Sequence, residues 1–548
     1  MTGATGPFSR AAALDRLASE QFDVLVVGGG ITGAGVALDA AARGLRTALV
    51  EQRDFASGTS SKSSKLVHGG LRYLQQRQFR LVRENLVERS RLLANAPHLV
   101  HRIPFVLPLS RSGALTGEAV ARSYSTALWA YDLGGGLRIG HRHRRLSAGD
   151  VRAALPSVRG DTISSGFRYY DAFADDARLT LAVVRTAVLH HGAVAANHTP
   201  VAGLVKDATG RIAGAVLGDG TEVRATVVVN AGGVWADEID ALHHPGRWPK
   251  LRPAKGIHLT VERSRLPWPA AGVLPVPGDR RSIFVVPWGD RVYFGTTDTG
   301  YSGPLDDPQC TPADVAYLLG AVNAVVTDPL SPADVVGTWA GLRPLLDEAR
   351  SSRTADLSRR HMVTTDGAVV TVTGGKLTTY RKMAADAVDQ VVAVLGRGHR
   401  RSPTRSLRLA GAGGPPPGWD LRLDAGTAAH LASRYGAEAP AVAALAAGDP
   451  DLARPLVAGL AYLRAEAVHA ARTEMAQTLD DVLSRRTRAL ILARDASAAA
   501  AADVARLLAP ELGWTPARTD QEASAYVAAV GRERAAAGLS PTPTCPQQ

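Results

Sequence analysis

The amino-acid sequence predicts a mixed α/β fold that is followed by a helical C-terminal domain. Residues 22–27 form an apolar run broken only by Asp23, three glycines follow, and an Ala-rich helix is expected over residues 31–43. A second strand is expected over residues 45–50, which completes a βαβ unit. The apolar pattern predicts more elements in the middle of the chain: strands at 225–229, 283–286, 292–295 and 369–373, and a helix at 76–95.

A change of composition marks the end of the α/β part. Residues 396–419 are rich in Arg, Gly and Pro, and the run Gly-Gly-Pro-Pro-Pro-Gly at 413–418 cannot continue a helix or a central strand. We therefore expect a linker over residues 396–419. Beyond it the chain is rich in Ala and Leu, and its apolar residues recur at intervals of three or four, which predicts a helical domain over residues 420–535 and a loose tail over residues 536–548. The apolar positions that show this spacing are 468, 471, 475, 479 and 482.

Length and composition define the class of protein. A chain of 548 residues is too long for one hydrophobic core, so two or three domains are expected. Cys310 and Cys545 support neither a disulfide framework nor a thiolate metal site, which fits a reducing cytoplasm. Residues 1–20 lack the apolar segment of a secretory signal and are expected to be a flexible extension that leads into a helix. No run of about eighteen apolar residues occurs, so no membrane span is predicted.

The chain is basic, with a formal net charge of +12 and a pI near 9.9. This charge favours anionic partners, which include acidic lipid, phosphorylated metabolites and nucleic acid, and it is equally compatible with a solvated Arg-rich surface. Arg485, Arg486 and Arg488, on an expected C-terminal helix, are predicted to face either anionic lipid or solvent. Aromatic residues make up only 5% of the chain, and no stacking platform accompanies the arginines, so nucleic acid is not expected as a partner.

The three glycines after the first strand belong to a dinucleotide-binding motif. Gly28, Gly30 and Gly33 fit the spacing G-x-G-x-x-G, which provides a tight turn, a close backbone approach to a pyrophosphate and close packing of helix on strand. Glu51 ends the next strand, where a carboxylate accepts hydrogen bonds from both hydroxyls of the adenosine ribose. Because Glu51 would repel a 2′-phosphate, NADP is disfavoured, but FAD and NAD both remain compatible with the motif.

A second segment favours FAD over NAD. A stretch rich in Ser and Lys covers residues 57–65, and its hydroxyls are expected to bind phosphate oxygens, which an NAD enzyme does not require. No second glycine motif of this spacing follows a strand, so electrons are expected to leave to an acceptor other than NAD(P)H. The expected cofactor-binding residues of this region are Ser61, Ser63, Ser64, His68, Gly69 and Gly70.

Another glycine turn lies late in the α/β part. Gly374, Gly375 and Lys376 follow the strand at 369–373, and a helix is expected to begin near Leu377. Backbone N–H groups and a helix N-terminus at this turn offer positive potential to a developing anion, such as the N1–C2=O edge of a reduced flavin. The alternative is an ordinary turn between a strand and a helix.

Eight segments, from VGGGITGAG at 27–35 to GGKLTTYRK at 374–382, match the motifs of one enzyme family in the same order. Through these segments the chain resembles the FAD-dependent, membrane-associated glycerol-3-phosphate dehydrogenases. HGGLRYL and GGKLTTYRK are the most specific of the motifs, and the similarity covers nearly the whole chain. The sequence departs from the family at Asn230 to Gly233 and at Ile257, and neither departure removes a charged or hydrogen-bonding role. The resembling segments are VGGGITGAG at 27–35, TSSKSSKLVHGGLRYL at 59–74, DDARL at 175–179, NAGGVW at 230–235, KGIH at 255–258, GTTD at 295–298, GLRPL at 341–345 and GGKLTTYRK at 374–382.

The resemblance implies a glutathione-reductase-like FAD-binding Rossmann domain interleaved with an antiparallel substrate domain, and a helical C-terminal domain. The FAD-binding domain is expected at about 21–100, 170–250 and 355–395, and the substrate domain at about 101–169 and 251–354. The implied reaction is oxidation of sn-glycerol 3-phosphate to dihydroxyacetone phosphate, with electrons passed to membrane quinone. The implied location is the cytoplasm, peripheral on the inner face of the cell membrane, and a homodimer is compatible with the resemblance.

Oxidation of a secondary alcohol by a flavin requires a group that takes the hydroxyl proton and, for this substrate, cations that bind phosphate. His258 is the candidate base because the pKa of a histidine lies near working pH, and Arg343 is expected to stabilise the incipient alkoxide. His68 is expected to contact the flavin or pack against it, and Gly232 to lie at the cofactor. The resemblance places these residues around the substrate: Arg72, Tyr73, His258, Arg343, Arg359 and Lys376.

Three other functions remain open at this point. One is a soluble oxidase of the same substrate that reduces oxygen, and a second is an amine or amino-acid oxidase on the same scaffold, which needs fewer phosphate-binding cations. A third is a flavoprotein that binds nucleic acid. No metal site is expected, because His141 and His143 belong to an exposed basic segment without a neighbouring carboxylate or cysteine in the sequence.

Overall fold

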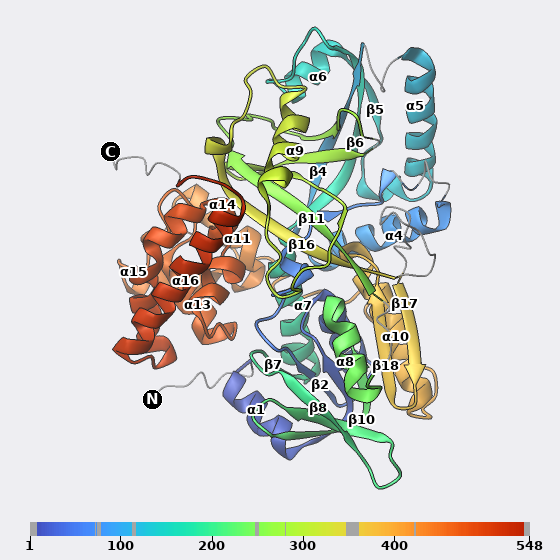
Figure 1. Cartoon of the computed structure of the whole chain (residues 1–548), viewed down its shortest axis with the longest axis vertical. Coiled ribbons are helices and arrows are strands. Elements are labelled where there is room, and N and C mark those ends of the chain that lie inside the picture. Colours follow the sequence, from blue (N-terminus) through green and yellow to red (C-terminus); the bar gives the residue numbers. More distant parts are fainter. Residues whose placement is uncertain are drawn as a thin grey trace.

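The structure, a computed structural model, describes residues 8–71, 73, 78–111, 117–246, 251–279, 281–346, 361–420 and 423–541. Its α/β part contains two β-sheets, one below the other in Figure 1, and the C-terminal helices pack along one side of both. The predicted mixed α/β fold with a helical C-terminal domain is confirmed.

The first sheet has a parallel centre. Its strands follow the order β17–β18–β10–β1–β2–β7, in which β17 alone runs antiparallel to its neighbour, and β8 and β9 extend β10 as an antiparallel pair. Carboxyl ends of parallel strands meet at one edge of a sheet, so the glycine turns that follow β1, β10 and β18 lie side by side. The strands are β1 (Gln21–Val27), β2 (Thr47–Val50), β7 (Val194–Ala196), β8 (Val201–Lys206), β9 (Ile212–Leu217), β10 (Glu222–Asn230), β17 (His361–Asp366) and β18 (Val369–Gly374).

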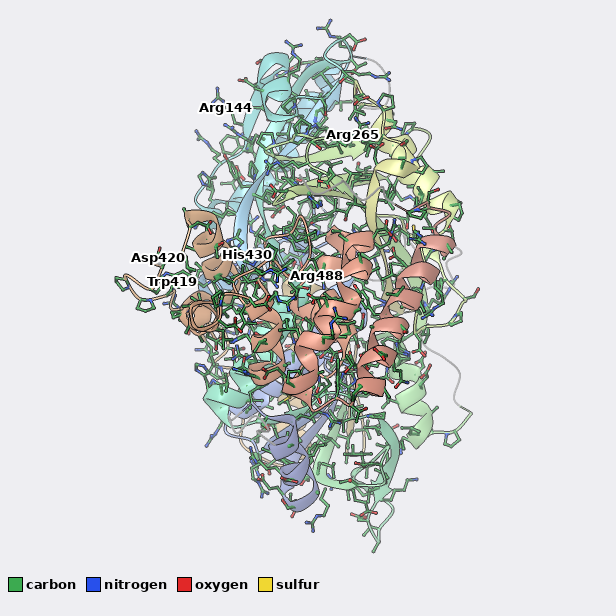
Figure 2. The ribbon with its side chains drawn as sticks, turned by 90° about the vertical axis from the view of Figure 1, so that its left-hand side faces the viewer. Arg144, Arg265, Trp419, Asp420, His430 and Arg488 are labelled. Carbon is green, nitrogen blue, oxygen red and sulfur yellow. The ribbon has the colours of Figure 1, made fainter. Side chains whose placement is uncertain are left out.

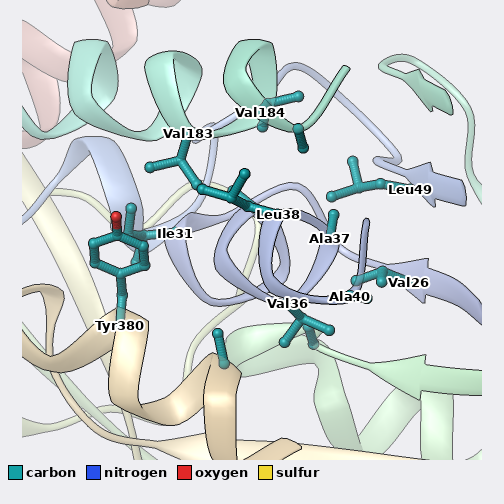
Figure 3. Packing of buried hydrophobic residues seen from close by; sticks show 14 of the residues in the cluster. Val26, Ile31, Val36, Ala37, Leu38, Ala40, Leu49, Val183, Val184 and Tyr380 are labelled. Atoms are coloured by element: carbon teal, nitrogen blue, oxygen red, sulfur yellow. The ribbon is translucent and has the colours of Figure 1, made fainter. Parts of the chain in front are cut away.

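Helix α2 (Ile31–Ala42) is the centre of the core of this domain. It is almost entirely buried because α7 (Asp176–His191) and α10 (Tyr380–Val394) pack against it. Figure 3 shows Val183 of α7 and Tyr380 of α10 close to the apolar side chains of α2. This packing explains why the residues of α2 are mostly small and apolar, and it fixes the direction in which the N-terminus of the helix points.

The second sheet is mainly antiparallel. Its order is β15–β11–β14–β13–β12–β4–β6–β3, with β16 paired to β11 and β5 paired to β6, and only β12 and β4 run parallel. Its strands are β3 (Leu66–Val67), β4 (Val100–Ser110), β5 (Arg144–Ser147), β6 (Ile163–Ala174), β11 (Leu251–Glu262), β12 (Ala271–Pro275), β13 (Ser282–Trp288), β14 (Arg291–Gly295), β15 (Thr299–Gly300) and β16 (Val335–Leu346). Its helices are α4 (Phe79–Asn95), α5 (Gly117–Leu133), α6 (Ala148–Ala154) and α9 (Pro312–Asn323).

The C-terminal domain is helical, and its pattern of apolar residues is interrupted once. Helix α13 ends at Thr473, Met475 adopts a left-handed conformation with φ 55°, and a π-helix (η8) begins at Asp481. The carboxylate of Asp481 accepts hydrogen bonds from the backbone N–H groups of Gln477 (2.8 Å) and Thr478 (3.2 Å). The helices are α11 (Ala425–Tyr435), α12 (Ala439–Gly448), α13 (Arg464–Thr473), η8 (Asp481–Arg486), α14 (Ala489–Leu492), α15 (Arg494–Leu512) and α16 (Pro516–Ala536).

Residues 8–19 and 537–539 are more ordered than the sequence suggests. Phe8 packs against Phe55, and Leu17 of α1 (Arg10–Ser19) is fully buried, so residues 8–19 are part of the fold. After α16, Ala537 and Leu539 are buried in the core of the second sheet. The expectation of a loose tail is therefore wrong for the residues that directly follow α16, because two apolar side chains anchor them. No described helix is long and apolar enough to cross a membrane.

The three arginines that the sequence predicts to face lipid or solvent face neither, which corrects that prediction. Arg485, Arg486 and Arg488 are buried, and Figure 2 labels Arg488 among the C-terminal helices. Arg485 and Arg486 donate hydrogen bonds to Asp54, and Arg488 lies 3.4 Å from Asp176. The carboxylates are several hundred residues away in the sequence, so no local pattern reveals them.

We predict that replacing Arg486 by methionine destabilises the protein by about 3–5 kcal/mol, because a carboxylate loses one of its buried partners. Arg486 donates to both oxygens of Asp54, at 2.6 and 2.7 Å. Arg472→Ala is the matched control: it removes a solvent-exposed pair with Glu511, worth at most about 1 kcal/mol. Urea-induced unfolding of both variants checks the prediction, and equal effects of the two substitutions would contradict it.

Candidate active site

A cavity of about 500 Å³ lies between the two sheets, at the edge of the first sheet where the glycine turns after β1, β10 and β18 lie. Segments from both sheets and from the Ser-Lys stretch line it, so residues far apart in the sequence come together. Thirteen of the residues predicted from the sequence line this cavity: Gly28, Gly30, Glu51, Ser63, Ser64, His68, Tyr73, Gly232, His258, Arg343, Gly375, Lys376 and Leu377. Arg72 and Arg359 lie outside the described residues.

The turn between β1 and α2 has no room for side chains. Gly28 has a φ of 110°, and a Cβ atom there would lie 2.6 Å from the carbonyl oxygen of Ala231. A Cβ atom on Gly33 would overlap the carbonyl oxygen of Gly28. The N-terminus of α2 therefore approaches the cavity closely, and its positive potential suits the pyrophosphate of a dinucleotide.

Glu51 is held in one orientation at the end of β2. Its carboxylate accepts hydrogen bonds from the backbone N–H groups of Gly29 (2.6 Å) and Arg53 (2.9 Å). Burial raises the pKa of Glu51, and the two backbone N–H groups partly oppose this effect. A fixed carboxylate on the cavity wall fits the ribose of FAD, whose hydroxyls can donate to it.

Hydroxyls of the Ser-Lys stretch bind other side chains of the protein. Ser63 donates to Asp176 (2.7 Å), the hydroxyl of Ser64 lies 3.0 Å from Nε2 of His258, and Ser61 does not line the cavity. Ser60, which the sequence did not single out, accepts a hydrogen bond from the backbone N–H of Ile31 (2.8 Å) at the N-terminus of α2. The stretch therefore connects the cofactor turn with the residues around His258.

His68, Gly69 and Gly70 serve different purposes. The backbone N–H of His68 donates to the hydroxyl of Thr378 (3.2 Å), and its imidazole lines the cavity. Gly69 and Gly70 do not line it. Gly69 leaves room for the hydroxyl of Tyr131, and Gly70, with a φ of 81°, leaves room for the ring of Tyr73.

The second glycine turn places Lys376 opposite Tyr73. Gly374 and Gly375 have φ values of 72° and 82°, and a Cβ atom on Gly375 would overlap the sulfur of Met383. The ammonium group of Lys376 lies 3.7 Å from the centroid of the Tyr73 ring. This cation–π contact connects a residue beyond β18 with one beyond β3, at the border of the two sheets.

His258 is deeply buried on β11, with only 2% of its surface exposed. Its ring stacks on the indole of Trp339, with centroids 4.7 Å apart and planes inclined by 9°. Burial, followed by the positive charges of Lys65 and Arg343, lowers the pKa of His258 well below its usual value. The imidazole is therefore neutral at pH 7, and Nδ1 has no hydrogen-bond partner among the described residues.

Arg343 projects from β16 toward the same cavity. Its guanidinium group donates to Asp298 (3.2 Å) and to the hydroxyl of Thr296 (3.0 Å), which hold it in place. Gly256 on the neighbouring strand provides the space, because a Cβ atom there would overlap the guanidinium group. A fixed cation and a neutral imidazole thus face one cavity, which is the arrangement that removal of a hydroxyl proton requires.

Besides Ser60, three residues around His258 were not identified from the sequence as part of the site: Lys65, Asp176 and Trp339. Lys65 and Asp176 lie within motifs that were recognised in the sequence, but these motifs do not indicate what the two side chains do. Trp339 follows no motif, and only the pairing of β16 with β11 places it opposite His258.

The segment around His141 and His143 differs in part from its prediction. Its arginines are exposed, but Nδ1 of His143 lies 2.8 Å from the carboxylate of Asp132, and His141 stacks on Tyr170. The carboxylate partner was missed because it lies on α5, which the sequence did not predict.

Comparisons with known proteins agree with the geometry of the cavity. The family model of FAD dependent oxidoreductases matches residues 23–381, and the model of the C-terminal domain of alpha-glycerophosphate oxidase matches residues 402–519. The chain is 44% identical to glycerol-3-phosphate dehydrogenase 2 of Mycobacterium tuberculosis and 43% identical to glycerol-3-phosphate dehydrogenase of Mycobacterium leprae. Each match covers 97% of this chain and 92% of the relative.

A solved structure is similar over nearly the whole chain. It is the glycerol-3-phosphate dehydrogenase from Bacillus halodurans complexed with FAD, which is 31% identical and superimposes with a TM-score of 0.77 over 96% of this chain and 97% of that one. The glycine turn without room for side chains, the helix N-terminus and Glu51 fit the same cofactor, which is FAD. The chain therefore belongs to the family of FAD-dependent glycerol-3-phosphate dehydrogenases.

Proposed function

We propose that the protein oxidises sn-glycerol 3-phosphate to dihydroxyacetone phosphate and passes the electrons to membrane quinone. This proposal rests mainly on one observation: the buried, neutral imidazole of His258 and two cations, Arg343 and Lys376, line the cavity that fits FAD. The names of the relatives in Mycobacterium and Bacillus support the same substrate. FAD, when bound, supplies the acceptor for the hydride from C2 of the substrate.

Different residues of the cavity accept the proton, stabilise the developing charge and bind the phosphate group. His258 accepts the proton of the C2 hydroxyl, for which its neutral form is required. Arg343 stabilises the negative charge that develops on the substrate oxygen, and its hydrogen bonds to Asp298 and Thr296 keep it oriented. The phosphate group is assigned to Lys376 and Tyr73 together with Arg72 and Arg359, because guanidinium forks suit phosphate oxygens.

Anaerobic bleaching of the purified yellow protein tests this function. Glycerol 3-phosphate should reduce the flavin, whereas glycine and D-amino acids should not, and quinone should reoxidise it faster than oxygen does. Reduction by amino acids alone would support an amine or amino-acid oxidase. Stoichiometric hydrogen peroxide without a need for quinone would support a soluble glycerol-3-phosphate oxidase instead.

We predict that His258→Gln lowers the limiting rate of anaerobic flavin reduction by about 10²–10⁴-fold, as expected for loss of a general base. In the wild type the rate should fall only at pH values well below 6.5, because the imidazole stays neutral until the pH reaches its lowered pKa. This acidic limb should be absent from the variant. Stopped-flow measurements at saturating substrate check both points, and a limb that persists in the variant would indicate another base.

Gly33→Ala should abolish retention of FAD, because the added Cβ atom overlaps the carbonyl oxygen of Gly28 and displaces the N-terminus of α2. The matched control is Gly531→Ala on α16, where no atom lies within 4 Å of the added Cβ. The ratio of flavin absorbance to protein absorbance after gel filtration gives the result. Full flavin content in the Gly33 variant would refute the role of this turn.

We further propose that α4, α5 and the 3₁₀ helix η2 (Gly136–Ile139) form the surface that contacts an anionic membrane. Of the six exposed large apolar side chains in the described part of the chain, four lie here: Phe79, Trp129, Leu133 and Leu137, with 59%, 44%, 74% and 46% exposed. Figure 1 shows α4 and α5 on the same side of the molecule. Exposed arginines accompany them, and apolar anchors with adjacent cations are typical of binding to anionic lipid surfaces. These arginines are Arg80, Arg83, Arg122, Arg138, Arg142, Arg144 and Arg145.

Exchange of Phe79 and Leu133 for serine should weaken binding to vesicles of phosphatidylglycerol at least about tenfold, because each side chain loses its apolar contact with lipid. Val527→Ser, an exposed apolar residue of the C-terminal domain, is the control and should leave binding unchanged. Vesicle co-sedimentation at several salt concentrations measures the effect. Equal binding by both variants would exclude this surface.

A further inference from the structure

Lys65 is a buried cation next to the candidate base. Its ammonium group lies 3.2 Å from both carboxylate oxygens of Asp176 and donates to the carbonyl oxygen of Ser61 at 3.1 Å. It also lies 4.5 Å from the ring centroid of Trp339, the residue on which His258 stacks. The side chain of Lys65 is completely inaccessible to solvent, so its charge acts on its neighbours without screening by water.

The backbone around Lys65 is fixed by the second sheet. The indole N–H of Trp339 donates to the carbonyl oxygen of Ser63 (3.1 Å), and the hydroxyl of Tyr293 donates to that of Ser64 (2.8 Å). These bonds leave the side chain of Ser64 facing His258, with Oγ 3.0 Å from Nε2. The position of the hydroxyl relative to the imidazole is therefore set by the same short segment that carries Lys65.

We propose that Lys65, anchored by Asp176, is a positioning residue that keeps His258 in its neutral, proton-accepting form and holds the Ser64 hydroxyl against Nε2. The inference rests on the proposed role of His258 as the base of the reaction. Lys65 does not touch the substrate in this proposal, and it acts only through its charge and through the segment that it fixes.

The charged groups that face His258 all lower the pKa of its imidazole. Lys65 approaches from the Ser-Lys stretch and Arg343 from β16, and both oppose a positive charge on the imidazole. Tyr293 of β14 and Ser64 are uncharged at neutral pH. Asp176 is ion-paired with Lys65 and with Arg488, so it compensates the charges of these cations. Burial lowers the pKa of Lys65 to about 8, so its ammonium group is present throughout the range in which His258 gains a proton.

The first test is an NMR titration of the FAD-loaded protein with ¹³C- and ¹⁵N-labelled histidine, in which the signal of His258 is assigned by its loss in His258→Gln. Lys65→Gln retains a hydrogen-bond donor but removes the charge. It should raise the titration midpoint of His258 by roughly one pH unit, as expected for removal of a nearby cation. Lys65→Arg, which keeps the charge, should leave the midpoint near that of the wild type, as should the control Lys206→Gln on the exposed surface of β8.

The second test is kinetic. In Lys65→Gln, the pH below which the rate of anaerobic flavin reduction falls should rise by the same amount, roughly one pH unit. Ser64→Ala should lower the limiting rate without moving the limb, because the charge of Lys65 is retained. A purely structural role of Lys65 would instead lower the rate at every pH and leave the midpoint unchanged, and that result would overturn the inference.

The wild type provides a test that does not depend on the stability of a variant. The signal of His258 should show a second, smaller step near pH 8, where Lys65 loses its proton. If Lys65→Gln does not fold, absence of this step overturns the inference. If glycerol 3-phosphate does not reduce the wild-type flavin, the proposed function fails, whereas the NMR titration still decides the role of Lys65.

Discussion

The buried ion pairs between the C-terminal domain and the loops of the FAD-binding sheet are the interaction on which the site depends. Asp54, directly after β2, receives hydrogen bonds from Arg485 and Arg486 of the C-terminal domain, all at 2.6–2.7 Å. A buried carboxylate is tolerated only when it is paired, so the loop after β2 cannot adopt this conformation without the C-terminal domain. Asp54, His198 and Asp481 lie as close together as metal ligands, but guanidinium groups already neutralise the two carboxylates.

A second set of ion pairs extends this connection to the substrate side. Asp175 and Asp176 begin α7, and Arg488 lies within 4 Å of both carboxylates. Burial raises the pKa of Asp175, but Arg488 and Arg434 outweigh this effect and lower it overall. Arg488 also donates to the carbonyl oxygen of Ser61, at 2.5 Å. The C-terminal domain therefore contacts the Ser-Lys stretch at Ser61 and reaches Lys65 through Asp176, although none of its described residues lines the cavity.

The sequence predicted the parts of the fold and of the cavity that depend on local rules. The tight turn at Gly28 and Gly33 and the position of Glu51 after β2 follow from steric limits and strand order, whereas the binding of FAD by these residues stays a prediction. The partners of Ser63 and Ser64 could not be predicted, because these hydroxyls bind residues 113 and 194 positions away. The environment of Arg486 is another example, since its carboxylate partner is 432 positions distant and neither residue follows a recognisable motif.

Positive charge around the cavity comes from backbone groups at the glycine turn and from side chains near His258. At the turn after β1, backbone N–H groups at the N-terminus of α2 provide the positive potential, and Gly28 and Gly33 place no side chains there. Near His258, Lys65 and Arg343 are positive, and the imidazole stays neutral because its protonation would place another charge beside these cations. The ion pairs of Asp176 compensate the buried charge of Lys65, and they place it near His258 rather than in the cavity. Ion pairs of Asp176 with Arg488 and with Lys65 therefore connect the C-terminal domain to a cation that lowers the pKa of His258.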